Sequence, residues 1–190
     1  MVSGDSFCFR SQTAADNSTF SSTSPSPNLR FLFLEFCQPA FAPNVTELDF
    51  GCANASCIRY GFHPFLLSLP SVKTLHTDER TLPYISILQE IIPETMLPML
   101  RRLKLKTCTQ VAGRVMTFLQ ARIDACFPIS VLDLTECFIE RMPPPIEMLE
   151  QINGLSVYWR RRGQDEISYY ECGSGTPETL CFLPAPTTNN

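Results

Sequence analysis

One pattern of large apolar residues recurs along the chain. Residues 100–108 (LRRLKLKTC) and 129–137 (ISVLDLTEC) share a frame with large apolar residues at positions one, four and six and cysteine at position nine. Looser copies of the frame surround three other leucines. The central leucines of the five copies are Leu48, Leu75, Leu103, Leu132 and Leu155, at successive spacings of 27, 28, 29 and 23 residues. Such spacings match the roughly 20 to 29 residues of a leucine-rich repeat.

Each copy of the frame predicts a short strand. Its apolar residues at positions four and six flank one exposed position, so the strand buries one face and exposes the other. The cysteine at position nine is expected under the turn that follows. We expect the central leucines to stack as one buried column, with one leucine per repeat. A sixth copy, at residues 29–37, lies close before the frame of Leu48 and is interpreted as a truncated repeat or a cap.

The segments between the strands show helical periodicity. Residues 110–126 carry an apolar stripe at helical spacing, made of Val111, Val115, Phe118, Leu119 and Ile123. This register leaves Arg114, Gln120 and Arg122 for solvent, and Gly113 weakens the first turn. Shorter helices are predicted over residues 63–69, 83–92 and 144–151. Pro83 suits a first helical turn, where its missing N–H removes no hydrogen bond.

These elements predict an α/β fold of the leucine-rich-repeat type. Each strand and helix pair cannot bury its apolar face alone, so neighbouring pairs stack into a solenoid with parallel strands on the concave side and short helices on the convex side. We assign the solenoid to residues 29–170. The Ser/Thr-rich residues 1–28 predict a disordered leader, and residues 171–190 predict a flexible tail. An ordinary βαβ sheet is the alternative fold.

The composition limits the cellular locations and the classes of partner that we expect. Among the 190 residues, 15 basic and 19 acidic side chains give a net charge of −4, which argues against a general nucleic-acid partner. The chain has neither a long apolar run nor a visible secretory signal, so we expect no membrane partner and a cytoplasmic or nuclear location. The nine cysteines are scattered, which favours free thiols.

Candidate catalytic chemistry is sparse. The sequence lacks a glycine-rich phosphate loop and the GxSxG, HExxH and CxxC motifs. A zinc site built from Cys52, Cys57, His63 and His76 would match no common ligand spacing. We therefore expect no enzyme activity, no catalytic residues, no metal and no cofactor.

Part of the chain resembles a known family. The stretch from Leu69 to Cys108, followed by VMTFLQARIDACFPISVLDLTEC, resembles the C-terminal leucine-rich-repeat region of fungal F-box proteins, particularly the large mushroom families. The resemblance covers roughly residues 29–160. It implies the substrate-recognition part of an F-box-like ubiquitin-ligase subunit. Residues 1–28 do not contain the F-box itself, which puts attachment to the SCF adaptor in question.

The exposed strand positions supply candidate binding residues. Successive side chains of a strand point to opposite faces of the sheet, so the polar neighbours of the buried leucines lie on the other face. We expect a protein partner to bind there, through Asp49, His76, Arg102, Lys104, Lys106, Asp133, Ser156 and Tyr158. Pairing of Lys104 with Asp133 across adjacent strands is the competing interpretation. A structural or effector-like repeat protein without a ubiquitin connection is the alternative function.

Overall fold

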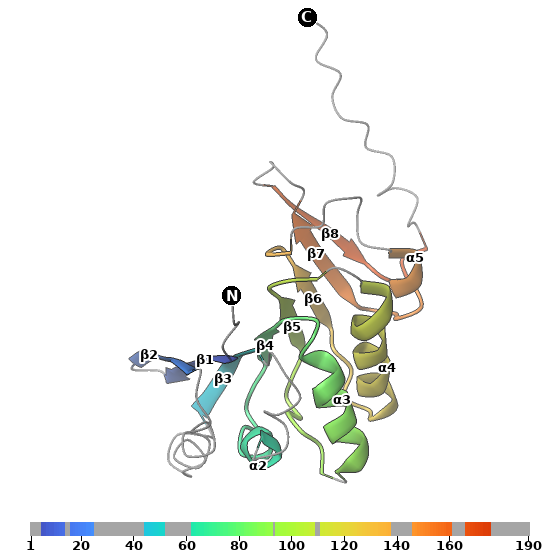
Figure 1. Cartoon of the computed structure of the whole chain (residues 1–190). Coiled ribbons are helices and arrows are strands. Elements are labelled where there is room, and N and C mark those ends of the chain that lie inside the picture. Colours follow the sequence, from blue (N-terminus) through green and yellow to red (C-terminus); the bar gives the residue numbers. More distant parts are fainter. Residues whose placement is uncertain are drawn as a thin grey trace, which may run out of the picture.

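The chain forms one mixed sheet. The computed structural model describes residues 5–13, 16–24, 44–51, 62–92, 94–108, 111–137, 146–160 and 166–175. Its eight strands lie in the order β2-β1-β3-β4-β5-β6-β7-β8 (Figure 1). Their bounds are β1 (Asp5–Thr13), β2 (Asp16–Ser24), β3 (Val45–Gly51), β4 (Thr74–Thr77), β5 (Arg102–Leu105), β6 (Val131–Leu134), β7 (Ser156–Arg160) and β8 (Ile167–Glu171).

The centre of the sheet is parallel. Strands β3 to β7 follow one another in chain order, and each pairs in parallel with the next. Antiparallel pairs flank this block, with β8 against β7 at one end and β1 against β3 at the other. The predicted α/β class with a mostly parallel sheet is confirmed.

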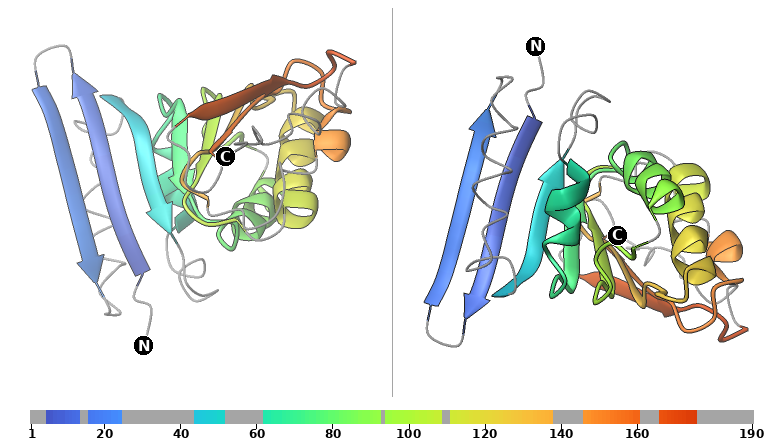
Figure 2. Two further views of the ribbon diagram at one scale, coloured as in Figure 1. Left: turned by 90° about the horizontal axis from the view of Figure 1, so that it is seen from above. Right: turned by 90° about the horizontal axis from the view of Figure 1, so that it is seen from below.

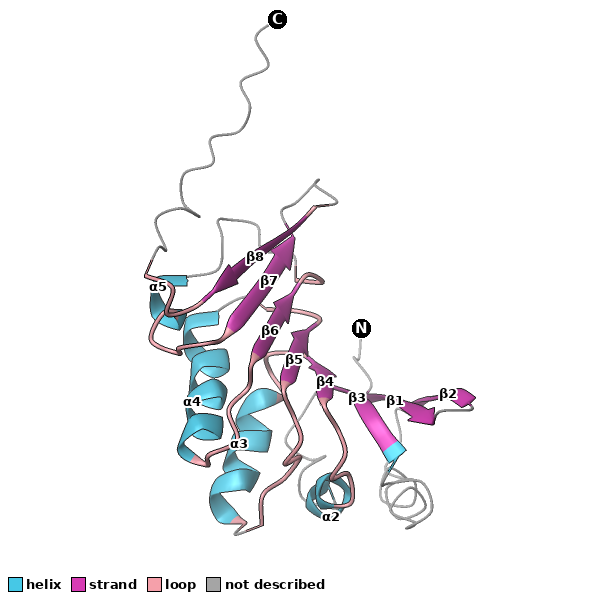
Figure 3. Ribbon diagram, turned by 180° about the vertical axis from the view of Figure 1, so that it is seen from behind, coloured by secondary structure: helices cyan, strands magenta, loops and turns pink. Residues whose placement is uncertain are grey.

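The described helices lie on one side of the sheet (Figures 1 and 3), which leaves the other side as an open face. They are α2 (Phe62–Leu67), α3 (Leu82–Ile91), α4 (Met116–Asp124) and α5 (Ile146–Leu149), with a π-helical turn η3 (Val111–Val115) leading into α4. All four predicted helices are therefore present. Pro83 stands in the first turn of α3, as expected. The turn that contains Gly113 is π-helical rather than α-helical.

Arg122 corrects the prediction for the helix at 110–126. Its side chain is buried, with 4% of its surface exposed, whereas the sequence pattern left it for solvent. The guanidinium donates hydrogen bonds to three backbone carbonyls, those of Phe127 (3.0 Å), Met96 (2.9 Å) and Leu97 (3.1 Å). Burial lowers the pKa of Arg122 to about 10, and the nearby charge of Arg101 adds to the effect. Arg122 therefore ties α4 to the loop that enters β5.

The N-terminal hairpin also differs from the prediction. Residues Asp5–Thr13 and Asp16–Ser24 form β1 and β2, paired in register from Asp5 with Ser24 to Thr13 with Asp16, where the composition predicts disorder. The average composition concealed a local alternation, because Phe7 and Phe9 recur at the period of a strand and threonine is a good strand former. Figure 2 shows β1 continuing the sheet beside β3. Residues 25–43 and 176–190 lie outside the described residues, together with the sixth copy of the frame and most of the predicted tail.

The leucine column is present in four of its five predicted positions. Leu48 pairs with Leu75, Leu75 with Leu103, and Leu103 with Leu132, and all four are fully buried. The fifth position belongs to Val157 rather than to Leu155. The turn after α5 extends to Leu155, whose N–H donates to the carbonyl of Ile152, so β7 begins at Ser156, two residues later than the frame predicts. Leu155 is buried beneath that turn instead.

The two cysteines of the repeat frame are expected to resist alkylation. Cys108 and Cys137 are buried, and the Cys137 thiol donates to the carbonyl of Leu105 (3.2 Å). Its interaction with Cys108 and its burial both raise the pKa of Cys137, which leaves little reactive thiolate. Cys126 is exposed and serves as the internal control. Native iodoacetamide labelling, read by peptide mass spectrometry, should modify Cys126 well before the other two. Equal rates at Cys126 and Cys137 would contradict the assignment.

Candidate functional site: the open face of the sheet

The strand register assembles a polar row on the open face. Asp49 of β3 pairs with His76 of β4, His76 with Lys104 of β5, and Lys104 with Asp133 of β6. Asp133 then pairs with Tyr158 of β7. Each of these side chains alternates with a buried core residue, so all of them point away from the helices. The sequence prediction that these positions share one face is therefore confirmed by the register.

Ser156 belongs to the neighbouring row. It pairs with Val131, and Val131 pairs with Arg102, which in turn pairs with Thr74. The sequence placed Ser156 in line with Asp133, but the later start of β7 shifts the register by two residues. Tyr158 takes that position instead. Both residues remain on the open face.

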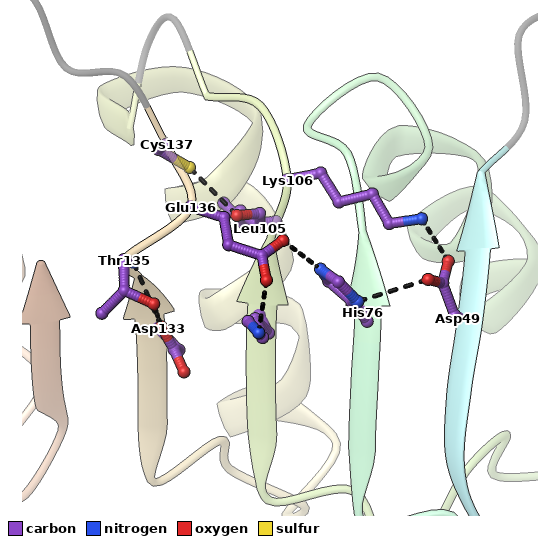
Figure 4. Close-up of polar contacts among 9 residues, drawn as sticks. Asp49, His76, Leu105, Lys106, Asp133, Thr135, Glu136 and Cys137 are labelled. Atoms are coloured by element: carbon purple, nitrogen blue, oxygen red, sulfur yellow. Dashed lines mark hydrogen bonds and ion pairs between the residues drawn. The ribbon is translucent and has the colours of Figure 1, made fainter. Parts of the chain in front are cut away.

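A chain of ion pairs runs across the first strands of this face (Figure 4). Lys106, directly after β5, pairs with Asp49. His76 lies between two carboxylates, with Nδ1 3.3 Å from an Asp49 oxygen and Nε2 2.9 Å from a Glu136 oxygen. Lys104 pairs with the other oxygen of Glu136 at 2.6 Å. One continuous network therefore joins β3, β4, β5 and the turn after β6.

Glu136 is the member that the sequence analysis missed. It lies in the turn after β6, beyond the alternating positions of the strand. Asp133 shapes this turn, because its Oδ1 accepts hydrogen bonds from the backbone N–H (3.1 Å) and hydroxyl (2.7 Å) of Thr135. The Asp-Leu-Thr sequence of this turn is a recognisable signal for it, since Asp side chains often bond to the backbone two residues on. The turn carries Glu136 over the open face.

The competing interpretation, in which Lys104 pairs with Asp133, is therefore wrong. Lys104 instead reaches Glu136, because Asp133 Oδ1 is engaged by Thr135. Glu136 is 45% exposed and its partner Lys104 is 28% exposed, so water screens this pair. Exposed pairs of this kind contribute about 1 kcal/mol or less to stability. The network orients side chains more than it stabilises the fold.

The network shifts two carboxyl pKa values. Burial raises the pKa of Asp49, but the hydrogen bonds and charges of His76 and Lys106 outweigh burial and hold it below its ordinary value. The hydrogen bond from Lys104 lowers the pKa of Glu136, against a smaller opposing effect of burial and with help from His76. Both carboxylates are therefore ionised at neutral pH.

These shifts predict an acid-dependent loss of stability. An acid with a lowered folded-state pKa stabilises the protein above its unfolded pKa, near 3.8 for Asp49 and 4.5 for Glu136, and the effect disappears as pH falls through the lower folded values. The Asp49→Asn/Glu136→Gln variant should be about 1 kcal/mol less stable than the natural chain at pH 6. The two should converge near pH 2 in urea titrations. Glu90→Gln on α3, outside the network, is the control, and a difference that is independent of pH would contradict this assignment.

A depression of about 300 Å³ lies over the network. Its lining combines acidic and basic side chains with a few neutral ones: Glu47, Leu48, Asp49, Thr74, His76, Arg102, Lys104, Asp133 and Glu136. Five of the eight predicted binding residues therefore line one surface. Lys106 joins through its ion pair with Asp49. Ser156 and Tyr158 extend the same face toward β8.

The β8 end of the open face is aromatic. The rings of Tyr158 and Tyr169 lie 5.1 Å apart at an interplanar angle of 42°. Tyr169 is 48% exposed and donates to Glu171 at 3.2 Å, and Ile167 is 50% exposed. The register pairs Ile167 with Arg160 and Tyr169 with Tyr158, so both residues share the face of Tyr158.

The geometry of the depression gives little support for catalysis. Both ring nitrogens of His76 are engaged by carboxylates, so neither is directed at a bound substrate. The described residues that line the depression include neither a cysteine nor a serine that could serve as a nucleophile. Within the described ranges, no three His, Cys, Asp or Glu side chains gather as metal ligands. Cys52 and Cys57 lie outside these ranges.

Comparison of the chain with models of protein families, with curated proteins and with solved structures found no match. No helix in the described part of the chain has the length and apolar character needed to cross a bilayer.

Proposed function

We propose that the chain is a protein-binding module and that its open sheet face holds the partner. The observation that carries this proposal is the row of outward-facing side chains that runs from Asp49 to Tyr158 across five adjacent strands. The row offers charges of both signs at one end and, at the other, the half-buried ring of Tyr158 beside the exposed Tyr169. Mixed polar surfaces with tyrosine and arginine suit protein partners, since these residue types often dominate binding energy.

The same face disfavours a polyanion. Four carboxylates, those of Glu47, Asp49, Asp133 and Glu136, line the depression beside Arg102 and Lys104. Nucleic-acid sites need an excess of cations to neutralise phosphates. A folded protein or peptide, with charges of both signs, complements this surface better.

We further propose that the strand and helix units are leucine-rich-repeat-like. The regular spacing of the central leucines and the chain order of β3 to β7 support this proposal. The resemblance to fungal F-box proteins then makes the substrate-recognition part of a ubiquitin-ligase subunit the specific proposal. A structural or effector-like repeat protein is the alternative. Capture of the purified SCF adaptor by the full chain would favour the first proposal over the second.

Charge reversal on the open face tests the binding proposal. The Arg102→Glu/Lys104→Glu variant should lose the partner that the natural chain captures from cells of its source, while its stability stays within about 1 kcal/mol. The matched control, Lys73→Glu/Arg80→Glu, reverses two exposed charges outside the lining of the depression and should retain the partner. Equal capture by the natural chain and the open-face variant would overturn the assignment. Turnover of a substrate by the purified chain would overturn the binding-module proposal itself.

A further inference from the structure

Among the described residues that line the depression, one arginine is left for a ligand. Lys104 and Lys106 are paired with Glu136 and Asp49. Arg102 is exposed, lines the depression and forms no ion pair with any residue in the described ranges. An unneutralised guanidinium with five N–H donors is well suited to bind a carboxylate in a bidentate geometry. This inference rests on the proposed function of the open face.

Uncharged residues lie between Arg102 and the aromatic end of the open face. Val131 and Ser156 are the next residues of its row, on β6 and β7. Tyr158 lies two residues beyond Ser156 on the same strand, with its ring beside that of Tyr169. Ile167 extends the apolar surface on β8. Arg102 and the Tyr158–Tyr169 pair are therefore separated along one direction across the strands.

Carboxylates elsewhere on the face determine the direction in which the ligand binds. Asp133 lies in the adjacent row, and Glu171 pairs in register with Ser156 at the β8 end. An acidic ligand group near either residue would meet a like charge. Arg160 is also exposed on this face, but it lies beside Ile167 on β8 and outside the lining of the depression. Within the depression Arg102 offers the favoured position for a ligand carboxylate, and the Tyr158–Tyr169 pair offers the favoured position for a large apolar group.

We infer that the open face binds an extended peptide segment whose acidic side chain pairs with Arg102 and whose large apolar side chain packs on Tyr158 and Tyr169. Two to three strand spacings of about 4.8 Å separate Arg102 from these rings along the sheet. An extended peptide advances about 3.3 Å per residue, so the acidic and apolar residues lie about three to four positions apart. The segment crosses the strands instead of adding to the sheet edge.

A synthetic peptide array tests this inference. The probes are nine-residue Gly/Ser peptides with one Glu and one Phe separated by one to six positions, with matched sets carrying Lys for Glu or Ser for Phe. The natural chain should retain the Glu/Phe peptides best at separations of three to four. Arg102→Glu should weaken that retention at least about tenfold and favour the Lys set, because the charge at position 102 is reversed. Tyr169→Ala should weaken retention of the Glu/Phe peptides and leave the Ser set unchanged.

Two results would overturn the inference. One is retention by the natural chain that does not change when Lys replaces Glu in the peptide. The other is retention that Arg102→Glu leaves intact, with circular dichroism confirming that the variant is folded. If the array fails while a protein partner is lost only in Arg102→Glu/Lys104→Glu, the peptide chemistry is wrong and the proposed function stands. If that double variant also keeps its partner, the proposed function falls as well.

Discussion

Replacing Leu103 by alanine is expected to lower the free energy of unfolding by about 2 to 5 kcal/mol. Leu103 is fully buried in the middle of the leucine column, between Leu75 and Leu132 in the strand register. The substitution removes buried apolar surface and leaves a cavity that neighbours on both sides cannot fill without breaking their own register. Such a loss is a large part of the 5 to 15 kcal/mol that typically stabilises a domain. Urea titration followed by circular dichroism measures it.

Ile91→Ala is the matched control for the leucine column. Ile91 is 72% exposed on α3, so its truncation removes little buried surface and should change stability by about 0.5 kcal/mol or less. Leu132→Ala should behave like Leu103→Ala, because it occupies the next position in the column. If both leucine variants were as stable as Ile91→Ala, the column would not be the core of the fold.

Replacing Arg122 by methionine is expected to cost about 3 kcal/mol or more. Methionine fills a similar volume but donates no hydrogen bond, so the carbonyls of Phe127 and Met96 lose their partner, whereas that of Leu97 still accepts from the Leu100 N–H. Each buried polar group left unpaired costs roughly 1 to 3 kcal/mol. The loop that these carbonyls anchor also holds Leu97 at a positive φ of 50°, a conformation that non-glycine residues seldom adopt.

Two further variants separate hydrogen bonding from charge at Arg122. Arg122→Lys keeps the charge but replaces the planar guanidinium with a single ammonium, so we expect an intermediate loss of stability. Arg101→Met removes an exposed arginine and should be nearly neutral. A loss in Arg122→Met of under 1 kcal/mol, or equal to that in Arg101→Met, would contradict the anchoring role.

Much of the sheet could be predicted from local patterns. The repeated leucines predicted the strands at Leu75, Leu103 and Leu132, because a half-buried strand needs apolar residues on one face and the frame supplies them. The register of the last repeat could not be predicted in this way. There the frame Ile152-x-x-Leu155-x-Val157 fits two alignments, and the length of the preceding turn decides between them.

The errors at Arg122 and in the N-terminal hairpin have a common cause. Residue type alone predicts that an arginine faces solvent and that a Ser/Thr-rich segment is disordered. Tertiary contacts decided otherwise. Three carbonyls at sequence separations of 5, 25 and 26 residues satisfy Arg122. Asp5–Thr13 forms a strand that pairs with β3, which lies more than 30 residues away in sequence.

The candidate site was predictable where it depends on alternation and unpredictable where it depends on a turn. Period two placed Asp49, His76, Lys104 and Asp133 on one face without any knowledge of the fold. Glu136 lies beyond the strand, and the turn that Asp133 holds brings its side chain to Lys104 on that face. Long side chains near a turn can choose among several partners, so Lys104 could not be assigned to Glu136 from the sequence.

Site-specific photo-crosslinking tests the central claim most directly. A photo-crosslinking amino acid introduced at Ser156 reports on the open face between Arg102 and the Tyr158–Tyr169 pair. The same group introduced at Glu90, exposed on α3, reports on the helical side of the sheet. The account predicts that the partner captured by the full chain is crosslinked from position 156 and not from position 90. Crosslinking from position 90 alone would place the partner on the helices and contradict the account.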